Sequence, residues 1–213
     1  MDRATEIAAL GVQAREAFET KHRAREVTIS ASRSAIQSCA ASIRATHRGE
    51  YDNAEVLARQ ARDFLAEADA ALVGLPDVRT NGPLSDAKKE LAEAWLTLTL
   101  VREDPLPSPD DLQIEIAPYC NGLAEAASEL RRQLLDRLRA GDMADAERLM
   151  GAMDEIYSLL VTVDYPDGVT GGLRRTTDAL RAVLERTRGD LTTAMVAARL
   201  QGAIERAQAT ATE

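Results

Sequence analysis

The chain contains few of the residues that cross-link small folds or serve in nucleophilic catalysis. Its 213 residues include two cysteines, two histidines, twelve glycines, seven prolines and only 3% aromatic residues. Two cysteines are too few for a disulfide framework, and Cys39 and Cys120 lack metal-ligand spacing, so we expect both to be reduced thiols. His22 and His47 are a poor basis for Ser-His-Asp or Cys-His catalysis. We expect both histidines at the surface or in packing.

Long apolar runs and a positive net charge are also absent. No uncharged apolar run reaches the 18 residues of a membrane span, and the N-terminal residues carry charges at helical spacing instead of a secretory signal. These observations favour a cytoplasmic protein without a membrane partner. The net charge of −9 argues against a surface that is basic as a whole. A local basic patch on an acidic protein stays compatible with nucleic acid.

Helix-forming sequence extends through most of the chain, which is 45% hydrophobic and 29% charged. We predict one all-α domain over residues 1–213, with seven helices. The first helix is expected from about residue 5 to 47, because this stretch has no proline, only Gly11, and apolar residues at helical spacing. At about 1.5 Å per residue it spans roughly 60 Å. Part of it should therefore project from the domain onto a neighbour.

Glycine, proline and capping residues mark the later boundaries. Gly49 and Gly141 suit the left-handed residue after a helix, and Pro118 suits a first helical turn. The similar segments at 49–57 and 141–149 have no third copy, so we interpret them as a shared stop-and-restart signal; a helical repeat array is the alternative. The later helices are expected at about 52–73, 85–103, 118–140, 143–163, 170–188 and 190–207, with a short turn from Ser108.

Two glutamates lie beside an apolar stripe in the helix expected at 85–103. Glu90 and Glu93 are one helical turn apart, so their Cβ atoms lie about 5–6 Å apart, close enough to share a divalent cation. The alternative is a solvated edge on which they pair with Lys88 or Lys89, and the spacing alone leaves both interpretations open. The stripe consists of Leu84, Ala87, Leu91, Trp95 and Leu98.

A second acidic strip lies on the helix expected at 118–140. Its periodicity predicts that it faces water, and for such a strip we expect ordinary surface ion pairs, such as Glu129 with Arg132. A ferritin-like di-iron site is excluded, because it needs two Glu-x-x-His pairs and the chain offers one, Glu19 to His22. The strip consists of Glu125, Ser128, Glu129, Arg132 and Asp136, opposite a core stripe of Leu123, Ala127, Leu130, Leu134 and Leu138.

The segments KKELAEAWL and NGLAEAASELRRQLLDRL, together with most of the remaining chain, resemble the translin and Trax family in its short prokaryotic form. In that family, seven-helix subunits assemble into closed, barrel-like octamers. The Trax-type subunit carries a magnesium-dependent endoribonuclease centre of acidic side chains facing the lumen, whereas translin proper binds single-stranded RNA or DNA without a complete centre. The resemblance implies a translin-like bundle in a closed homo-oligomeric barrel, with an octamer favoured.

The resemblance also assigns four carboxylates to the centre. Glu90 and Glu93 match the family's Glu-x-x-Glu-Ala; Glu125 stands at the usual aspartate position, one methylene longer, and Glu129 matches the following glutamate. These four residues are implied to be both catalytic and metal-binding, with Mg²⁺ as the cofactor and Mn²⁺ as a substitute. The acidic strip would then face an internal cavity, where Mg²⁺ takes one or two carboxylates together with waters and phosphate oxygens.

Contact with the substrate requires positively charged side chains, and Arg132 matches a basic position of the family. For each candidate the alternative is a solvated helix face. Because aromatic residues are scarce, we predict salt-sensitive, backbone-directed binding of single-stranded RNA, or of DNA. The candidates are Arg131, Arg132, Arg174, Arg175, Arg186 and Arg188, besides Lys88 and Lys89.

The function predicted on these grounds is Mg²⁺-dependent endoribonuclease activity, that is, phosphodiester hydrolysis. Two alternatives remain open. One is a non-catalytic, translin-like shell that binds single-stranded RNA or DNA, and the other is a helical-repeat scaffold for protein partners. The complete set of four carboxylates favours catalysis over the shell.

Overall fold

The structure, a computed structural model, describes residues 2–78 and 81–210 and is all-α over this part of the chain. No described helix combines the length and the apolar character that crossing a membrane would require. The predicted all-α fold class is confirmed. The helices are α1 (Arg3–His47), α2 (Tyr51–Ala71), α3 (Asn81–Arg102), α4 (Pro109–Leu112), α5 (Ile116–Ala140), α6 (Met143–Leu160), α7 (Asp167–Thr170) and α8 (Leu173–Thr210).

Most predicted boundaries agree with the structure, and one prediction is wrong. Gly49 and Gly141 adopt the left-handed conformation, with φ of 75° and 80°. The two helices expected at 170–188 and 190–207 are instead one continuous helix, α8, with Gly189 in its interior. An isolated glycine lowers the stability of a helix by only about 1 kcal/mol. Leu191, two residues after Gly189, is buried, and its packing stabilises the helix beyond the glycine. The described residues therefore form six long helices and two of four residues each, not seven helices.

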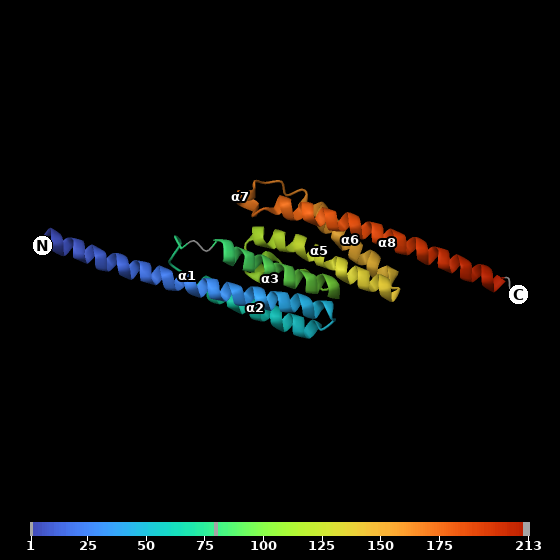
Figure 1. The fold of residues 1–213 in the computed structure, drawn as a ribbon, viewed down its shortest axis with the longest axis horizontal. Coiled ribbons are helices and arrows are strands. Elements are labelled where there is room, and N and C mark those ends of the chain that lie inside the picture. Colours follow the sequence, from blue (N-terminus) through green and yellow to red (C-terminus); the bar gives the residue numbers. More distant parts are fainter. Residues whose placement is uncertain (1, 79–80, 211–213) are drawn as a thin grey trace.

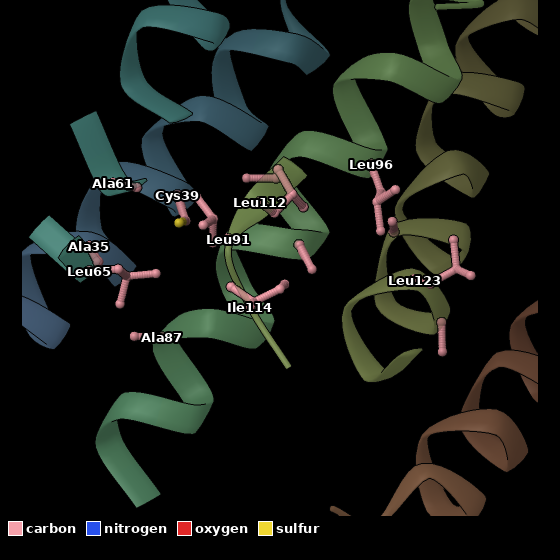
Figure 2. Close-up of a cluster of buried hydrophobic side chains, with 14 of the residues drawn as sticks. Ala35, Cys39, Ala61, Leu65, Ala87, Leu91, Leu96, Leu112, Ile114 and Leu123 are labelled. Carbon is pink, nitrogen blue, oxygen red and sulfur yellow. The ribbon is translucent and has the colours of Figure 1, made fainter. Parts of the chain in front are cut away.

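The long helices pack in successive layers, as Figure 1 shows. The pair α1 and α2 packs on α3, α3 packs on α5, and α5 packs on both α6 and α8. Because α3 has neighbours on opposite sides, it is buried on most of its surface, which explains its nearly continuous apolar run. Small side chains such as Ala35, Cys39 and Ala61 are fully buried among larger leucines in the core (Figure 2).

The ends of the first and last helices extend beyond this core. Residues 3–23 of α1, the N-terminal arm, and residues 192–210 of α8, the C-terminal arm, include no buried residue and point away from opposite ends of the bundle (Figure 1). The prediction that the first helix projects from the domain is confirmed. Large apolar side chains are exposed on both arms, namely Ile7, Leu10, Val12 and Phe18 on the first and Val196, Leu200 and Ile204 on the second.

Candidate metal centre

The candidate centre forms at a close approach of α3 and α5, which Gly122 makes feasible. A Cβ atom at Gly122 would lie 2.5 Å from the Cβ of Ala92 and 2.6 Å from the carbonyl oxygen of Lys89. Any larger residue would push the helices apart. No role was predicted for Gly122 from the sequence, although a glycine inside a helix often has a packing reason.

Three of the four predicted carboxylates meet at this crossing. Glu90 and Glu93 of α3 and Glu125 of α5 each present an oxygen, and these oxygens lie within 4.8 Å of one another. Glu93 is only 9% exposed, and the other two are half-buried. Among the described residues, no other group of three or more potential metal ligands comes this close together. The predicted convergence of the two acidic helices is therefore observed.

Glu129, the fourth predicted carboxylate, lies one turn further along α5 and has a different partner. Its Oε2 atom is 2.6 Å from Nε2 of His47, at the end of α1. The side chain of His47 is 2% exposed, and its Nδ1 atom is 3.1 Å from the Gln133 amide nitrogen. The default pair of Glu129 with Arg132 is not formed, so that prediction is wrong. No sequence signal links positions 47 and 129, because only the tertiary structure brings the C-terminal end of α1 to α5.

Burial and mutual repulsion perturb the carboxylates of α3. Burial is the largest influence on Glu93, and the nearby charges of Glu90, Glu125 and Glu129 add to it, raising its pKa to about 8. Burial also raises the pKa of Glu90, against the opposing effect of Lys89. Bringing several carboxylates together in a partly dry site disfavours their charged forms. The cluster is therefore suited to taking up a proton or a cation.

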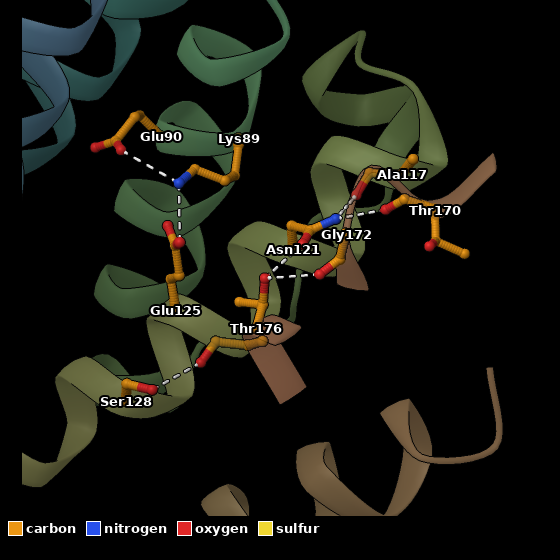
Figure 3. Close-up of polar contacts among 10 residues, drawn as sticks. Lys89, Glu90, Ala117, Asn121, Glu125, Ser128, Thr170, Gly172 and Thr176 are labelled. Atoms are coloured by element: carbon orange, nitrogen blue, oxygen red, sulfur yellow. Dashed lines mark hydrogen bonds and ion pairs between the residues drawn. The ribbon is translucent and has the colours of Figure 1, made fainter. Parts of the chain in front are cut away.

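Lys89 supplies one positive charge to the cluster. Its Nζ atom lies 2.8 Å from Oε1 of Glu125 and 3.7 Å from Oε1 of Glu90 (Figure 3). Glu90 thus pairs with Lys89, as the alternative of a solvated helix edge predicted. Glu93 does not fit that alternative, because it is buried. Lys88 points elsewhere: it is 6% exposed, with its Nζ atom 3.0 Å from both Asp69 and Glu115.

The arginines proposed to contact RNA fall into two groups. Arg131 and Arg132 line an open groove of about 520 Å³ on α5 that also contains Glu129. Arg131 is 2.7 Å from Asp190, whereas Arg132 is exposed and makes no ion pair within the part of the chain that is described. Arg132 is therefore the predicted RNA contact that lines the same groove as Glu129 and forms no ion pair with a described residue. The remaining candidates lie on α8 and do not line this groove: Arg174, Arg175, Arg186 and Arg188.

A polar contact holds the start of α8 against α5, next to Gly122. Asn121 is 4% exposed; its amide nitrogen donates to the carbonyl oxygen of Thr170 at 2.7 Å. Its amide oxygen accepts a hydrogen bond from the Thr176 hydroxyl, also at 2.7 Å (Figure 3). Asn121 therefore fixes α7 and α8 on α5, one residue from Gly122. This role of Asn121 was not predicted from the sequence.

The donor set of the cluster consists of oxygen atoms only. Hard cations such as Mg²⁺ and Mn²⁺ prefer carboxylate and water ligands, whereas zinc sites usually include histidine or cysteine. Burial also disfavours the charged form of the Glu93 carboxylate unless a cation lies close to it. Fold and site together define an all-α protein with an acidic centre suited to a hard divalent cation.

Comparison with known proteins identifies the family. The chain is 31% identical to AfC3PO in the structure of its complex with duplex RNA, covering 87% of this chain and 96% of that chain, with a TM-score of 0.79. A second AfC3PO structure gives 32% identity and the same TM-score, and apo-NeC3PO, at 17% identity and a TM-score of 0.75, shares the fold. Both are translin/Trax-type C3PO components. The chain belongs to the translin/Trax family.

The chain is also similar to a further protein over most of its length. The uncharacterized protein MJ0175 of Methanocaldococcus jannaschii is 32% identical over 193 residues, which is 88% of this chain and 84% of the relative. No family model matches the chain.

Proposed function

We propose that the protein is a subunit of a homo-oligomeric, metal-dependent endoribonuclease that hydrolyses phosphodiester bonds of single-stranded RNA. The observation that carries this proposal is the meeting of Glu90, Glu93 and Glu125, from two helices, within 4.8 Å. The similarity to AfC3PO, which has been solved with duplex RNA, supports RNA as the class of substrate.

In this proposal, Glu90, Glu93 and Glu125 hold Mg²⁺ or Mn²⁺, and Glu129 lies at the edge of the site. When bound, the metal supplies an acidified water and offsets charge on the scissile phosphate. The carboxylate of Glu93 is buried, so water screens its attraction to the cation only weakly. Arg132 contacts the phosphate backbone in the groove that contains Glu129, where its guanidinium forms no ion pair with any described residue.

The oligomeric part of the proposal rests on the two arms. Each carries apolar side chains of large size, such as Phe18 at 69% and Leu200 at 62% exposure. Contiguous exposed apolar residues on protruding helices are typical of association surfaces. A closed homo-oligomer, with an octamer favoured, would cover both arms, and light scattering of the purified protein measures the assembly.

Cleavage of a short labelled RNA in the presence of Mg²⁺ tests the catalytic part. Glu90→Gln and Glu129→Gln are expected to abolish cutting while each variant still binds RNA about as tightly as the parent chain. A single-stranded and a duplex RNA of the same sequence should be compared, because the solved relative holds a duplex. Cleavage that persists in EDTA would contradict a metal-dependent mechanism.

A non-catalytic RNA-binding shell is the second candidate, and the position of Lys89 favours it. The ammonium group already compensates part of the charge of Glu125, at 2.8 Å, so the cluster is partly neutralised without a bound metal. RNA binding that is retained without cleavage under Mg²⁺, Mn²⁺ or other divalent cations would support the shell.

A further inference from the structure

We propose that Lys89 is an internal competitor of the divalent cation: its ammonium group and the metal exclude one another from the carboxylates of Glu90 and Glu125. The inference rests on the proposed function, because it takes these carboxylates as metal ligands. It adds a determinant of metal affinity within the chain itself.

The position of the ammonium group carries the inference. Nζ of Lys89 lies between a carboxylate of its own helix and one of the neighbouring helix, at 3.7 Å from Glu90 and 2.8 Å from Glu125 (Figure 3). These are two of the three carboxylates whose oxygens meet within 4.8 Å. A cation bound by the same oxygens would lie within a few ångströms of the ammonium group, and repulsion between like charges is strong in a partly dry site.

The lysine has an alternative position available. Its side chain is 25% exposed, and the flexible four-carbon stem allows the ammonium group to rotate toward water. Lys88 differs, because it is 6% exposed and is fixed by Asp69 and Glu115. The displaced ammonium group of Lys89 then remains near the site, where it adds positive charge for a phosphate group.

The exchange has a consequence for the protein without metal. Lys89 is then the one cationic side chain that forms ion pairs with the cluster of Glu90, Glu93 and Glu125 among the described residues. It therefore limits the repulsion between the carboxylates when no divalent cation is bound. Its presence should lower metal affinity, so that the site fills only when the cation is sufficiently concentrated.

Calorimetric titration of the oligomeric protein with Mn²⁺ and with Mg²⁺ tests the competition. Lys89→Met is expected to lower the Kd for the metal about tenfold, a change of the size seen for residues next to metal ligands. Lys89→Arg keeps a positive charge at the position and should bind the metal within about threefold of the parent chain. Lys21→Gln controls for net charge, since Lys21 forms an exposed pair with Asp77 away from the cluster.

The outcomes separate the inference from the proposed function. Metal binding by the parent chain with an unchanged or higher Kd in Lys89→Met would overturn the competition and leave the proposed nuclease intact. Tighter binding in Lys89→Met without RNA cleavage would support the competition and count against the nuclease. If no variant binds either cation, both proposals are overturned.

Amine labelling provides a second readout on the unaltered protein. The chain has three lysines, Lys21, Lys88 and Lys89, so the acylation rate of each can be followed separately by mass spectrometry. Saturation with Mg²⁺ should increase the labelling rate of Lys89 severalfold, with the same midpoint as the calorimetric titration, while the other two rates stay constant. An unchanged or lower rate at Lys89 would contradict its displacement.

Discussion

Between α3 and α5, the carboxylate-bearing residue Glu93 is 9% exposed, whereas Phe18 on the N-terminal arm is 69% exposed. A charged group is thus buried and a large apolar group lies in water, each against the usual distribution of residues. Both arrangements are unfavourable for the folded chain on its own. Among the described residues, the three carboxylates of the cluster form ion pairs with only one positive charge, that of Lys89, and the apolar side chains of the arms are not covered by an apolar surface.

The two regions would be stabilised by different kinds of partner. Burying a carboxylate among other carboxylates is unfavourable unless a proton or cation compensates it. Exposing a row of apolar side chains is unfavourable unless another surface covers it. We therefore expect the first region to bind a cation and the second to bind protein, and each region can be altered without changing the other.

Replacing Glu93 by glutamine should affect catalysis and stability in opposite directions. Loss of a metal ligand is expected to lower the rate of RNA cleavage by at least roughly 100-fold. Without metal, the same change should raise Tm at neutral pH, because the neutral amide replaces a carboxylate that is unfavourable to ionise at this site. Cleavage assays and thermal unfolding test both effects, with the exposed Glu155→Gln as the control. A lower Tm of the metal-free variant at neutral pH would contradict this account of the cluster.

The pH dependence of this stability difference follows from the raised pKa of Glu93. The group titrates near 4.5 when unfolded and at about 8 in the folded protein, so the folded state binds its proton more tightly. The stabilising contribution is fully present below about pH 4.5 and is lost as the pH rises to 8. The Tm of the metal-free parent chain should therefore fall relative to that of Glu93→Gln across this range. A difference in Tm independent of pH would contradict the assignment.

Replacing His47 tests whether Glu129 belongs functionally to the cluster. His47→Phe keeps an aromatic ring but removes the 2.6 Å contact to Glu129, and we expect it to weaken metal binding roughly 10-fold. His47→Gln, which offers an amide donor, should recover part of the affinity. Calorimetric titration with Mn²⁺ provides the measurement. Equal loss in both variants would indicate that His47 contributes only to packing.

Replacing Gly122 by alanine tests the close approach of the two central helices. The added Cβ atom would overlap with Ala92 and with the backbone of α3, so we expect a loss of about 1–3 kcal/mol in the free energy of unfolding. Gly151→Ala is the matched control, since a Cβ atom there meets nothing within 4 Å and alanine favours the helix by about 1 kcal/mol. Denaturant unfolding measures both. A stabilising Gly122→Ala would refute the close packing.

A smaller change is expected from a single substitution on the arm, because the apolar contacts there are shared among several residues. Phe18→Glu should weaken self-association by about tenfold at most and leave the helical content intact. Gln13→Glu introduces the same charge at an exposed polar position of the arm and should have little effect. Light scattering over a range of concentrations checks the result. An identical assembly in Phe18→Glu would remove the arm from the association surface.

Much of the fold follows from local sequence. The absence of proline from residues 5–47 predicts the long first helix, and Gly49 and Gly141 mark helix ends at which the chain takes a left-handed residue. Gly189 led to the wrong prediction of a break in α8. A glycine is tolerated inside this helix because buried residues on both sides of it stabilise the helix by packing. Local signals thus set the helical class, and packing decided which glycines end a helix.

The candidate site was predictable to a lesser extent. The spacing of Glu90 and Glu93, and of Glu125 and Glu129, is a property of each helix and could be read directly. The partners of these residues could not, since the contact of Glu129 with His47 joins positions that are 82 residues apart.

By itself, the sequence determined the helical class, the positions of most helices and the presence of two acidic helix faces, because these depend on residues within one or two helical turns. The tertiary structure decided which faces meet. It brought three carboxylates together at Gly122, placed the ammonium group of Lys89 between two of them, and left both arms outside the core. The physical reason is that burial and charge compensation depend on distances between helices, which local periodicity does not fix.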